Sequence, residues 1–541
     1  MIHFKKVVLA LLLMGASLTL PAQNHMDVIL DLEGNQWYDH FGIKLAALDF
    51  NGDGFDDLAV LQSWWVPDSL DAQLGAEYVG RNWGRILFYY GGPGFDGIPD
   101  FTIEGERPNH FRYAGVIERF ASLGDMNGDG YDDLGIFDYP NRIAVYFGGA
   151  APSTQPGFMI DPIPDATTNS YFSIMPCGDL NDDGYDDLAY FFNNDSYTGY
   201  GSLRLVFGGT FQELVVAETY VGNYEYRYIH GIGDINSDGF GDYVMTIFQQ
   251  GGGQMINSAY LGYGGPQIDP TDAALFSEVT YASCNMRRPL GDVNGDGYAD
   301  FVGLMDGLIK CWYGGQSISA DYDLSLYPYY QGGGASDHGL VHGDLNGDGY
   351  EDVIGADPRV GYFDGRACVW LGGANMNGTA DLFINAWAYG MQMGLGIASG
   401  DFNADGCDDL AISCPTFPDI SSFPGRLRVY AGNPQLADTT TGIEEEVMPG
   451  IGWYFRALPN PLPGGSGLRL RFYGSGYEAC PGLELKICNL RGQLVYSGDI
   501  AQAALERGEM EIGVLKLAAG VYIAELSQGG QKLQSAKFTV K

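Results

Sequence analysis

A nine-residue acidic pattern, DxNxDGxxD, occurs seven times in the chain and limits its possible folds more than any other feature. The copies begin at residues 49, 125, 179, 234, 292, 344 and 401. Units of this spacing, repeated this often, are typical of propellers and solenoids rather than of independent domains. Seven copies also lie within the range of about four to eight blades that β-propellers contain.

A second repeat accompanies the first. A short apolar run follows each acidic pattern directly, and further on comes a β-prone segment that ends in glycine, at residues 85–92, 142–149, 202–209, 258–265, 308–315, 366–373 and 426–432. Another β-prone run follows most of these, at residues 99–105, 158–163, 213–221 and 381–387. Each unit therefore predicts four antiparallel strands, the content of one blade. We expect an all-β fold with a seven-bladed β-propeller over residues 23–433.

The two ends of the repeat region predict how the ring closes. The seventh unit has no evident fourth strand after Gly432, whereas residues 26–32 form an unassigned strand ahead of the first acidic pattern. We expect this N-terminal strand to complete the last blade, because the ring would then have no open sheet edge.

The acidic pattern itself predicts a calcium loop. Positions 1, 3, 5 and 9 supply side-chain oxygens, position 7 supplies a backbone carbonyl, and the glycine at position 6 permits a sharp turn. Hard oxygen ligands select a hard cation, and a flexible set of several carboxylates favours Ca²⁺ over Mg²⁺. The predicted side-chain ligands are Asp49, Asn51, Asp53, Asp57, Asp125, Asn127, Asp129, Asp133, Asp179, Asn181, Asp183, Asp187, Asp234, Asn236, Asp238, Asp242, Asp292, Asn294, Asp296, Asp300, Asp344, Asn346, Asp348, Asp352, Asp401, Asn403, Asp405 and Asp409. The predicted carbonyl ligands belong to Phe55, Tyr131, Tyr185, Phe240, Tyr298, Tyr350 and Cys407.

Two other interpretations of the loops are weaker. An EF-hand requires a glutamate at position 12, where this chain has residues such as Val60 and Gly303, and its flanks would be helical. A solvated acidic turn explains one isolated copy better than seven matched ones.

Up to seven structural Ca²⁺ ions would reduce the formal charge from −40 to −26. That acidic balance argues against nucleic acid as a partner, because phosphates attract basic surfaces.

The loops and their flanks resemble the FG-GAP repeat of integrin α-subunits and bacterial surface proteins, over residues 26–433. The Phe-Gly pair for which the repeat is named stands at Phe41-Gly42, but other units have drifted, as in Phe120-Ala121 and Tyr171-Phe172. The resemblance implies a seven-bladed propeller with Ca²⁺ between the first and second strands of a blade. Seven complete loops look more like the bacterial members than like integrins.

After a polar linker over residues 434–456, residues 457–541 alternate like the strands of a small β-sandwich. This segment resembles the C-terminal sorting domain of the type IX (Por) secretion system. The matching residues are Leu458-Pro459-Asn460-Pro461, Asn489-Leu490-Arg491-Gly492, Gly520-Val521-Tyr522 and Lys537-Phe538-Thr539-Val540-Lys541. The resemblance implies passage through the outer membrane by that machinery, then release or attachment to surface lipopolysaccharide.

Residues 1–22 have the pattern of a signal peptide, with Lys5 and Lys6 before an apolar stretch and a cleavage site after Ala22. No later stretch approaches 18 uninterrupted apolar residues, so we expect no transmembrane segment in the mature chain. The expected location is the cell surface or the medium. Export permits disulfides, and Cys407/Cys414 and Cys480/Cys488 are the close pairs, although spacing cannot assign them.

Strand alternation places the acidic loops on one face of the ring and gathers aromatic and basic residues on the other. The candidate ligand-binding residues of this second face are Trp37, Tyr38, Trp64, Trp65, Arg112, Tyr113, Tyr226, Tyr228, Arg288, Tyr330, Trp387 and Tyr389. Such residues suit glycans or protein loops, but many could instead pack between blades. We expect an adhesion or recognition module for a glycan or protein ligand and not an enzyme, because no catalytic constellation stands out. A polysaccharide-acting lyase or glycosidase and a structural surface-layer component are the alternatives.

Overall fold

The structure is a computed structural model. Of the 541 residues, it describes 25–34, 39–67, 83–111, 120–139, 142–160, 171–193, 201–219, 225–251, 254–269, 273–280, 285–305, 308–326, 339–386, 391–417, 424–437, 443–444, 453–458, 467–474, 483–489, 493–501, 509–514, 517, 520–528 and 531–540. The predicted signal peptide and most of the predicted linker lie outside these ranges.

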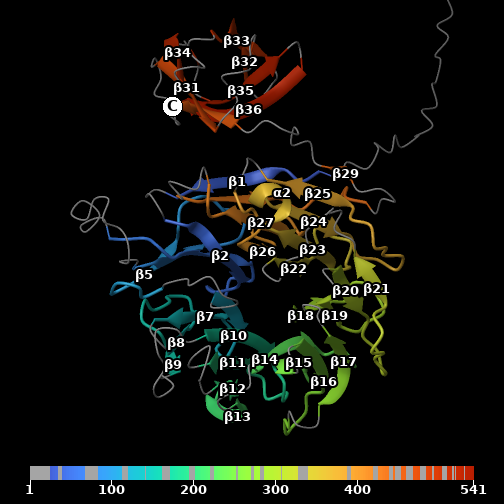
Figure 1. Cartoon of the computed structure of the whole chain (residues 1–541). Coiled ribbons are helices and arrows are strands. Elements are labelled where there is room, and N and C mark those ends of the chain that lie inside the picture. The colour runs from blue at the N-terminus through green and yellow to red at the C-terminus, as the bar shows by residue number, and fades with distance from the viewer. Residues whose placement is uncertain are drawn as a thin grey trace, which may run out of the picture.

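Seven antiparallel sheets follow one another along the chain as the blades of a propeller (Figure 1). Blade 1 contains β2 (Phe41–Leu48), β3 (Asp57–Gln62), β4 (Arg85–Tyr89) and β5 (Phe101–Glu104), and blade 2 contains β6 (Phe120–Gly124), β7 (Asp133–Asp138), β8 (Arg142–Tyr146) and β9 (Phe158–Ile160). Blade 3 contains β10 (Tyr171–Gly178), β11 (Asp187–Asn193), β12 (Gly201–Phe207) and β13 (Gln212–Thr219). Blade 4 contains β14 (Glu225–Gly233), β15 (Asp242–Gly251), β16 (Gln254–Gly262) and β17 (Ala274–Thr280).

The fifth and sixth blades are β18 (Asn285–Gly291), β19 (Asp300–Met305), β20 (Leu308–Trp312), β21 (Leu324–Leu326); and β22 (Leu340–Gly343), β23 (Asp352–Asp357), β24 (Arg366–Trp370), β25 (Leu382–Asn385). The short helix α2 (Val360–Phe363) connects β23 to β24, and β29 (Ile443–Glu444) pairs in parallel with β25. The seventh blade contains β26 (Ile397–Gly400), β27 (Asp409–Cys414) and β28 (Arg426–Tyr430). The predicted all-β propeller is thus confirmed.

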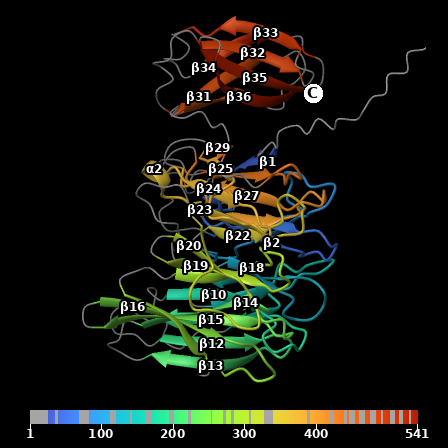
Figure 2. The same cartoon turned by 90° about the vertical axis from the view of Figure 1, so that its right-hand side faces the viewer.

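The first strands of the blades line the centre of the ring. β2, β6, β10, β14, β18, β22 and β26 each contact the first strand of the next blade, and β26 contacts β2 again, so the ring is closed. Figure 1 shows these strands toward the middle and β5, β9, β13 and β21 at the perimeter. Figure 2 shows the blades edge on, with their strands running between the two faces.

The N-terminal strand β1 (Val28–Glu33) is the outer strand of the seventh blade, as predicted. It pairs antiparallel with β28, from Val28 opposite Tyr430 to Glu33 opposite Arg426. Figure 1 shows this blue strand beside the orange strands from the end of the propeller. The two ends of the ring therefore share one sheet.

The core lies between neighbouring blades. The second strands β3, β7, β23 and β27 are buried along their whole length, because both of their faces meet other blades. Between blades 1 and 2, the rings of Phe50 and Phe88 stack 4.3 Å apart and are fully buried. Burial of each such side chain contributes about 1.5–3 kcal/mol.

The C-terminal region forms two further sheets, as expected of a small β-sandwich. One contains β30 (Trp453–Leu458), β31 (Gly467–Gly474) and β34 (Glu509–Val514), and the other contains β32 (Leu483–Asn489), β33 (Leu494–Asp499), β35 (Gly520–Gln528) and β36 (Gln531–Val540). Cys407, Cys414 and Cys488 are free, so neither of the two close cysteine pairs forms a disulfide.

Candidate metal loops and the opposite face

Each acidic loop connects the first strand of a blade to the second. Position 9 of the loop is also the first residue of the second strand, as with Asp57 at the start of β3. The seven loops therefore lie at equivalent places around one face of the ring, where strand alternation predicts them.

Side-chain carboxylates organise the loop backbone. In the first loop, Asp49 Oδ1 accepts hydrogen bonds from the backbone N–H groups of Gly52 and Asp53, at 2.8 and 3.1 Å, and Asp49 Oδ2 accepts one from Gly54 at 2.9 Å. The glycine at position 6 has φ between 84° and 94° in all seven loops. Only glycine adopts this left-handed conformation without strain. The turn thus brings the N–H groups of Gly52, Asp53 and Gly54 to the Asp49 carboxylate.

The aspartate at position 9 is fully buried in every blade. In the second blade, Asp133 Oδ2 accepts a hydrogen bond from Met126 N at 3.0 Å and Oδ1 accepts one from Gly148 N at 3.1 Å. Gly148 belongs to the glycine pair that ends the third strand, so this bond explains the second sequence repeat. The same bond from a glycine N–H to position 9 occurs in all seven blades.

Burial raises the pKa of these carboxyl groups, and the neighbouring aspartates at positions 1 and 5 add to the effect, while the backbone hydrogen bonds oppose it. The pKa rises to about 8 in Asp133 and Asp352. It rises to about 7 in Asp57, Asp187, Asp242, Asp300 and Asp409. Close carboxylates in a buried site repel one another, and a cation relieves that repulsion.

The donor set of the loops fits a hard cation, although the side chains do not converge as they stand. Among the described residues, no three Asp, Glu, His or Cys side chains gather into a group that could hold a metal ion. In the first loop the amide Nδ2 of Asn51 lies between two carboxylates instead, 3.1 Å from Asp53 Oδ2 and 3.4 Å from Asp57 Oδ1. Rotation of the Asn51 amide would place its oxygen, instead of its nitrogen, between the carboxylates of Asp53 and Asp57. In the seventh loop Asp409 Oδ2 is buried without a hydrogen-bond partner among the described residues.

The opposite face is only partly described. Trp37, Tyr38, Arg112, Tyr113, Tyr330, Trp387 and Tyr389, and the side chain of Tyr226, lie outside the described residues. Trp64 is half-buried, with its ring 4.7 Å from that of His40. Tyr228 and Arg288 are half-buried in β14 and β18. Trp65 is only 4% exposed and packs 4.9 Å from the Arg85 guanidinium, so it belongs to the core of blade 1 and is not available to a ligand.

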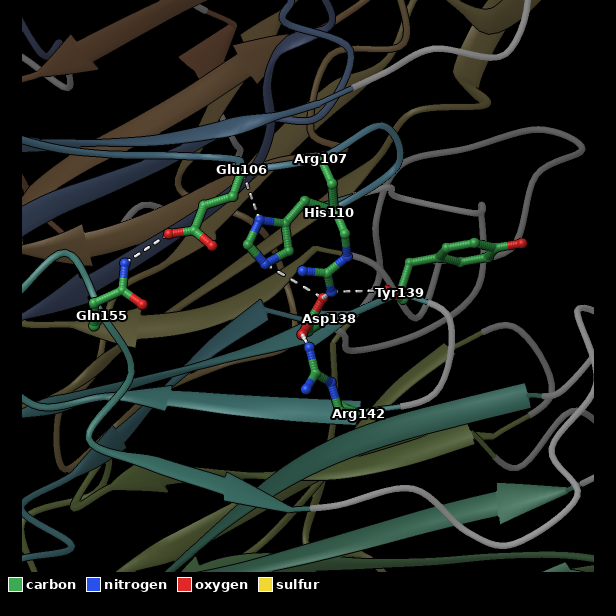
Figure 3. A network of polar contacts seen from close by, with 7 residues as sticks. All are labelled: Glu106, Arg107, His110, Asp138, Tyr139, Arg142 and Gln155. Atoms are coloured by element: carbon green, nitrogen blue, oxygen red, sulfur yellow. Dashed lines mark hydrogen bonds and ion pairs between the residues drawn. The ribbon is translucent and has the colours of Figure 1, made fainter.

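A buried ion-pair network on this face was not predicted (Figure 3). Asp138, at the end of β7, is held by the guanidinium groups of Arg107 and Arg142 and lies 3.3 Å from His110 Nε2. Arg107 and His110 belong to the connection from blade 1, so the network joins two blades. Burial lowers the pKa of His110, and the attraction of Asp138 opposes that effect.

The other ring nitrogen of His110 is also engaged, because Nδ1 accepts a hydrogen bond from Glu106 N at 2.9 Å. The Glu106 side chain turns away from Asp138 and accepts a hydrogen bond from Gln155 at 2.7 Å (Figure 3). With both histidine nitrogens occupied, the network acts as a brace between blades. Its members lie up to 49 residues apart in sequence, so no local pattern signals it.

The closed ring and the seven repeated loops together define a seven-bladed β-propeller with an acidic loop in every blade. Residues 41–60 match the FG-GAP repeat, and residues 458–541 match the secretion system C-terminal sorting domain. The propeller thus carries an FG-GAP repeat and integrin-α-like homology, and a sorting domain of the Por secretion system follows it. That domain indicates secretion through this system.

Three integrin chains illustrate the similarity. Human integrin alpha-IIb is 30% identical over 165 residues, covering 29% of this chain and 15% of the relative. Integrin alpha-5 of Xenopus laevis is 26% identical over 178 residues, covering 30% and 15%, and Drosophila melanogaster integrin alpha-PS2 is 32% identical over 178 residues, covering 30% and 12%. The chain therefore spans about 15% of the length of the curated relatives it matches.

Two solved structures are similar at 9% sequence identity. The β-fructofuranosidase of Schwanniomyces occidentalis complexed with fructosyl-erythritol has a TM-score of 0.28, covering 70% of this chain and 90% of that one. Saccharomyces cerevisiae Sqt1 has a TM-score of 0.34, covering 82% and 97%. Within the described part of the chain, no helix has the length and apolarity to cross a membrane.

Proposed function

We propose that this protein is a secreted or surface-attached propeller whose seven loops bind Ca²⁺ as structural ions and whose opposite face recognises a glycan or protein ligand. The observation that carries the proposal is the sevenfold repetition of one loop geometry, in which the position-1 carboxylate accepts a hydrogen bond from the N–H of a left-handed glycine. A merely solvated turn has no need of matched oxygen donors in every blade.

The residues that would hold the ion are those at positions 1, 3, 5 and 9, with the carbonyl at position 7. When bound, Ca²⁺ would neutralise carboxylates whose mutual repulsion otherwise destabilises the loop. Extracellular calcium modules have dissociation constants of about 0.1–1 mM. At millimolar Ca²⁺, each loop would gain roughly 0.5–1.5 kcal/mol by mass action.

The recognition role rests on the opposite face, away from the loops. Trp64 is half-buried there. Aromatic side chains combine a large apolar surface with a polar edge, which suits sugars and protein loops. The resemblance to integrin α chains and the sorting domain support a role outside the cell.

A glycan and matrix-protein array tests the proposal, run in millimolar Ca²⁺ and again in EGTA alongside thermal melts. We expect Trp64→Ala to weaken ligand binding while the melting temperature stays close to that of the wild type. Tyr263→Ala is the matched control, because Tyr263 is 49% exposed and follows β16 on the face of the loops. Equal ligand binding by the two variants, or a Trp64→Ala variant that binds as well as the wild type, would contradict the assignment of ligand binding to the face opposite the loops.

We propose binding without turnover. Assays of array hits for reducing ends or unsaturated products separate this role from a glycosidase or a lyase. Self-assembly on cells without any ligand would instead favour a surface-layer component.

A further inference from the structure

The aspartate at position 8 of four loops contacts the neighbouring blade. Asp132 Oδ2 accepts a hydrogen bond from Asp49 N at 2.9 Å, and Asp186 Oδ2 accepts one from Asp125 N at 2.8 Å. In each pair the donor is position 1 of the preceding loop. The carboxylate of one loop therefore holds the backbone of the first predicted metal ligand in the loop before it.

The same bond continues across the seam of the ring. Asp408 Oδ2 accepts from Asp344 N at 2.8 Å, and Asp56 Oδ2 accepts from Asp401 N at 3.0 Å, although the latter two residues are 345 positions apart. Four such bonds link the loops of blades 6, 7, 1, 2 and 3 in series.

Two of the glycines that precede position 1 lie close to this contact. A Cβ atom at Gly124 would lie 2.0 Å from Asp186 Oδ2, and one at Gly400 would lie 2.7 Å from Asp56 Oδ2. At these two positions a Cβ atom would therefore displace the carboxylate.

The series stops in the other part of the ring. Position 8 is Gly241 in blade 4 and Ala299 in blade 5, and neither has a side-chain acceptor. In blade 6 it is Glu351, whose Oε2 lies 2.8 Å from His342 Nδ1. Backbone bonds still join these loops, as from Ala299 N to Asp234 O at 3.4 Å.

We propose that the position-8 aspartates are positioning residues that set the Ca²⁺ affinity of the preceding loop, so that the loops of blades 6, 7, 1, 2 and 3 bind as a coupled array. The inference rests on the proposed Ca²⁺ binding of the loops. A carboxylate that fixes the ligand-bearing backbone lowers the ordering cost of binding, and its charge attracts the cation. Ordering one loop then prepares the next, which is positive coupling between sites.

Hydrogen exchange measured by mass spectrometry during a Ca²⁺ titration of the full chain reads each loop separately. In Asp132→Ala, we expect the half-saturation of residues 49–57 to rise about tenfold, while residues 125–133 stay within about twofold of the wild type. Asp132 belongs to the second loop, so this displaced effect distinguishes positioning from a local defect. A shift confined to residues 125–133 would overturn the proposal.

Ala299 supplies a matched pair of variants that do not risk the fold. Ala299→Asp should lower the half-saturation of residues 234–242 several-fold, because its carboxylate reaches the N–H of Asp234 across Gly233. Ala299→Gly should leave that loop unchanged. Equal half-saturation of residues 234–242 in the two variants would overturn the proposed coupling. Calcium that protects no loop of the wild type would instead refute the proposed metal binding itself.

Discussion

At the scale of single residues, the position-9 aspartate has two tasks. Asp133 accepts hydrogen bonds from Met126 N and Gly148 N, and so joins the start of its loop to the end of the third strand. It also contributes one of the carboxylates proposed to bind Ca²⁺. The first task needs two acceptor oxygens, and the second needs the negative charge that they carry.

Asp133→Asn affects both tasks, and Ca²⁺ distinguishes them. The amide oxygen can accept one of the two backbone hydrogen bonds, but the amide NH2 group then faces the other N–H group, so in EGTA we expect the free energy of unfolding to fall by about 1–3 kcal/mol. In millimolar Ca²⁺ the variant should lack the roughly 0.5–1.5 kcal/mol contributed by that loop. Chemical denaturation with and without Ca²⁺ measures both values, and Asp182→Asn, outside the predicted ligand positions, is the control. An undiminished response to Ca²⁺ would contradict the assignment of Asp133 as a ligand.

At the scale of elements, the connections between blades carry buried polar braces. Asp138 is 2% exposed and compensates both Arg107 and Arg142. Because Arg107 lies in the connection from blade 1 and Arg142 lies in β8, the brace fixes how β7 and β8 sit against that connection.

Asp138→Ala should destabilise the protein by about 1–3 kcal/mol, since buried His110 loses the carboxylate while the two guanidinium groups, which are 38% and 35% exposed, can regain water. Glu106→Gln is the control, because the Glu106 side chain is exposed and contacts Gln155 rather than Asp138. It should cost less than about 1 kcal/mol. Urea unfolding followed by tryptophan fluorescence compares them, and similar losses in both would argue against the brace.

The sequence predicted these elements well where the signal was local and repeated. The acidic pattern marks the junction of first and second strands in every blade, and the glycine pair marks the end of the third. The contacts of Asp132 and Asp138 with other blades escaped prediction, because they depend on how blades pack. Trp65 was assigned to the ligand-binding face for a similar reason, because the sequence does not show that its ring folds back against Arg85 in the core of blade 1. How Asn51 and Asp53 point within a loop is likewise a matter of side-chain rotation that spacing does not determine.

At the scale of the whole molecule, the seam between the two chain ends decides whether the ring stays closed. Asp31 of β1 receives hydrogen bonds from Arg426 Nε at 2.5 Å and from Arg428 Nε at 3.2 Å. Burial alone would raise the pKa of Asp31, but the two arginines outweigh it and the pKa is lowered.

This shift predicts a pH dependence. A carboxyl group whose folded-state pKa is lowered stabilises the fold above its unfolded pKa, near 3.8, and loses that contribution as the pH falls through the folded value. Asp31→Asn should therefore be less stable than the wild type at pH 6, by about 1 kcal/mol because Asp31 is 34% exposed and screened by water. The difference in stability between Asp31→Asn and the wild type should disappear below pH 3.8. Thermal melts from pH 6 to pH 3 measure it, and a constant gap would contradict the ion pair.

Removal of β1 tests the seam as a whole. A chain that begins at residue 34 exposes the edge of β28, and unpaired edges of this kind recruit other strands. We expect it to self-associate and to melt at a lower temperature. A peptide of residues 25–34 added in trans should restore both properties, because the missing strand regains its pairing with β28. The Asp31→Asn peptide should restore them less well, since it lacks the charge that Arg426 and Arg428 hold. A shortened chain that stays monomeric, with no change in melting temperature, would show that the first strands close the ring without the clasp.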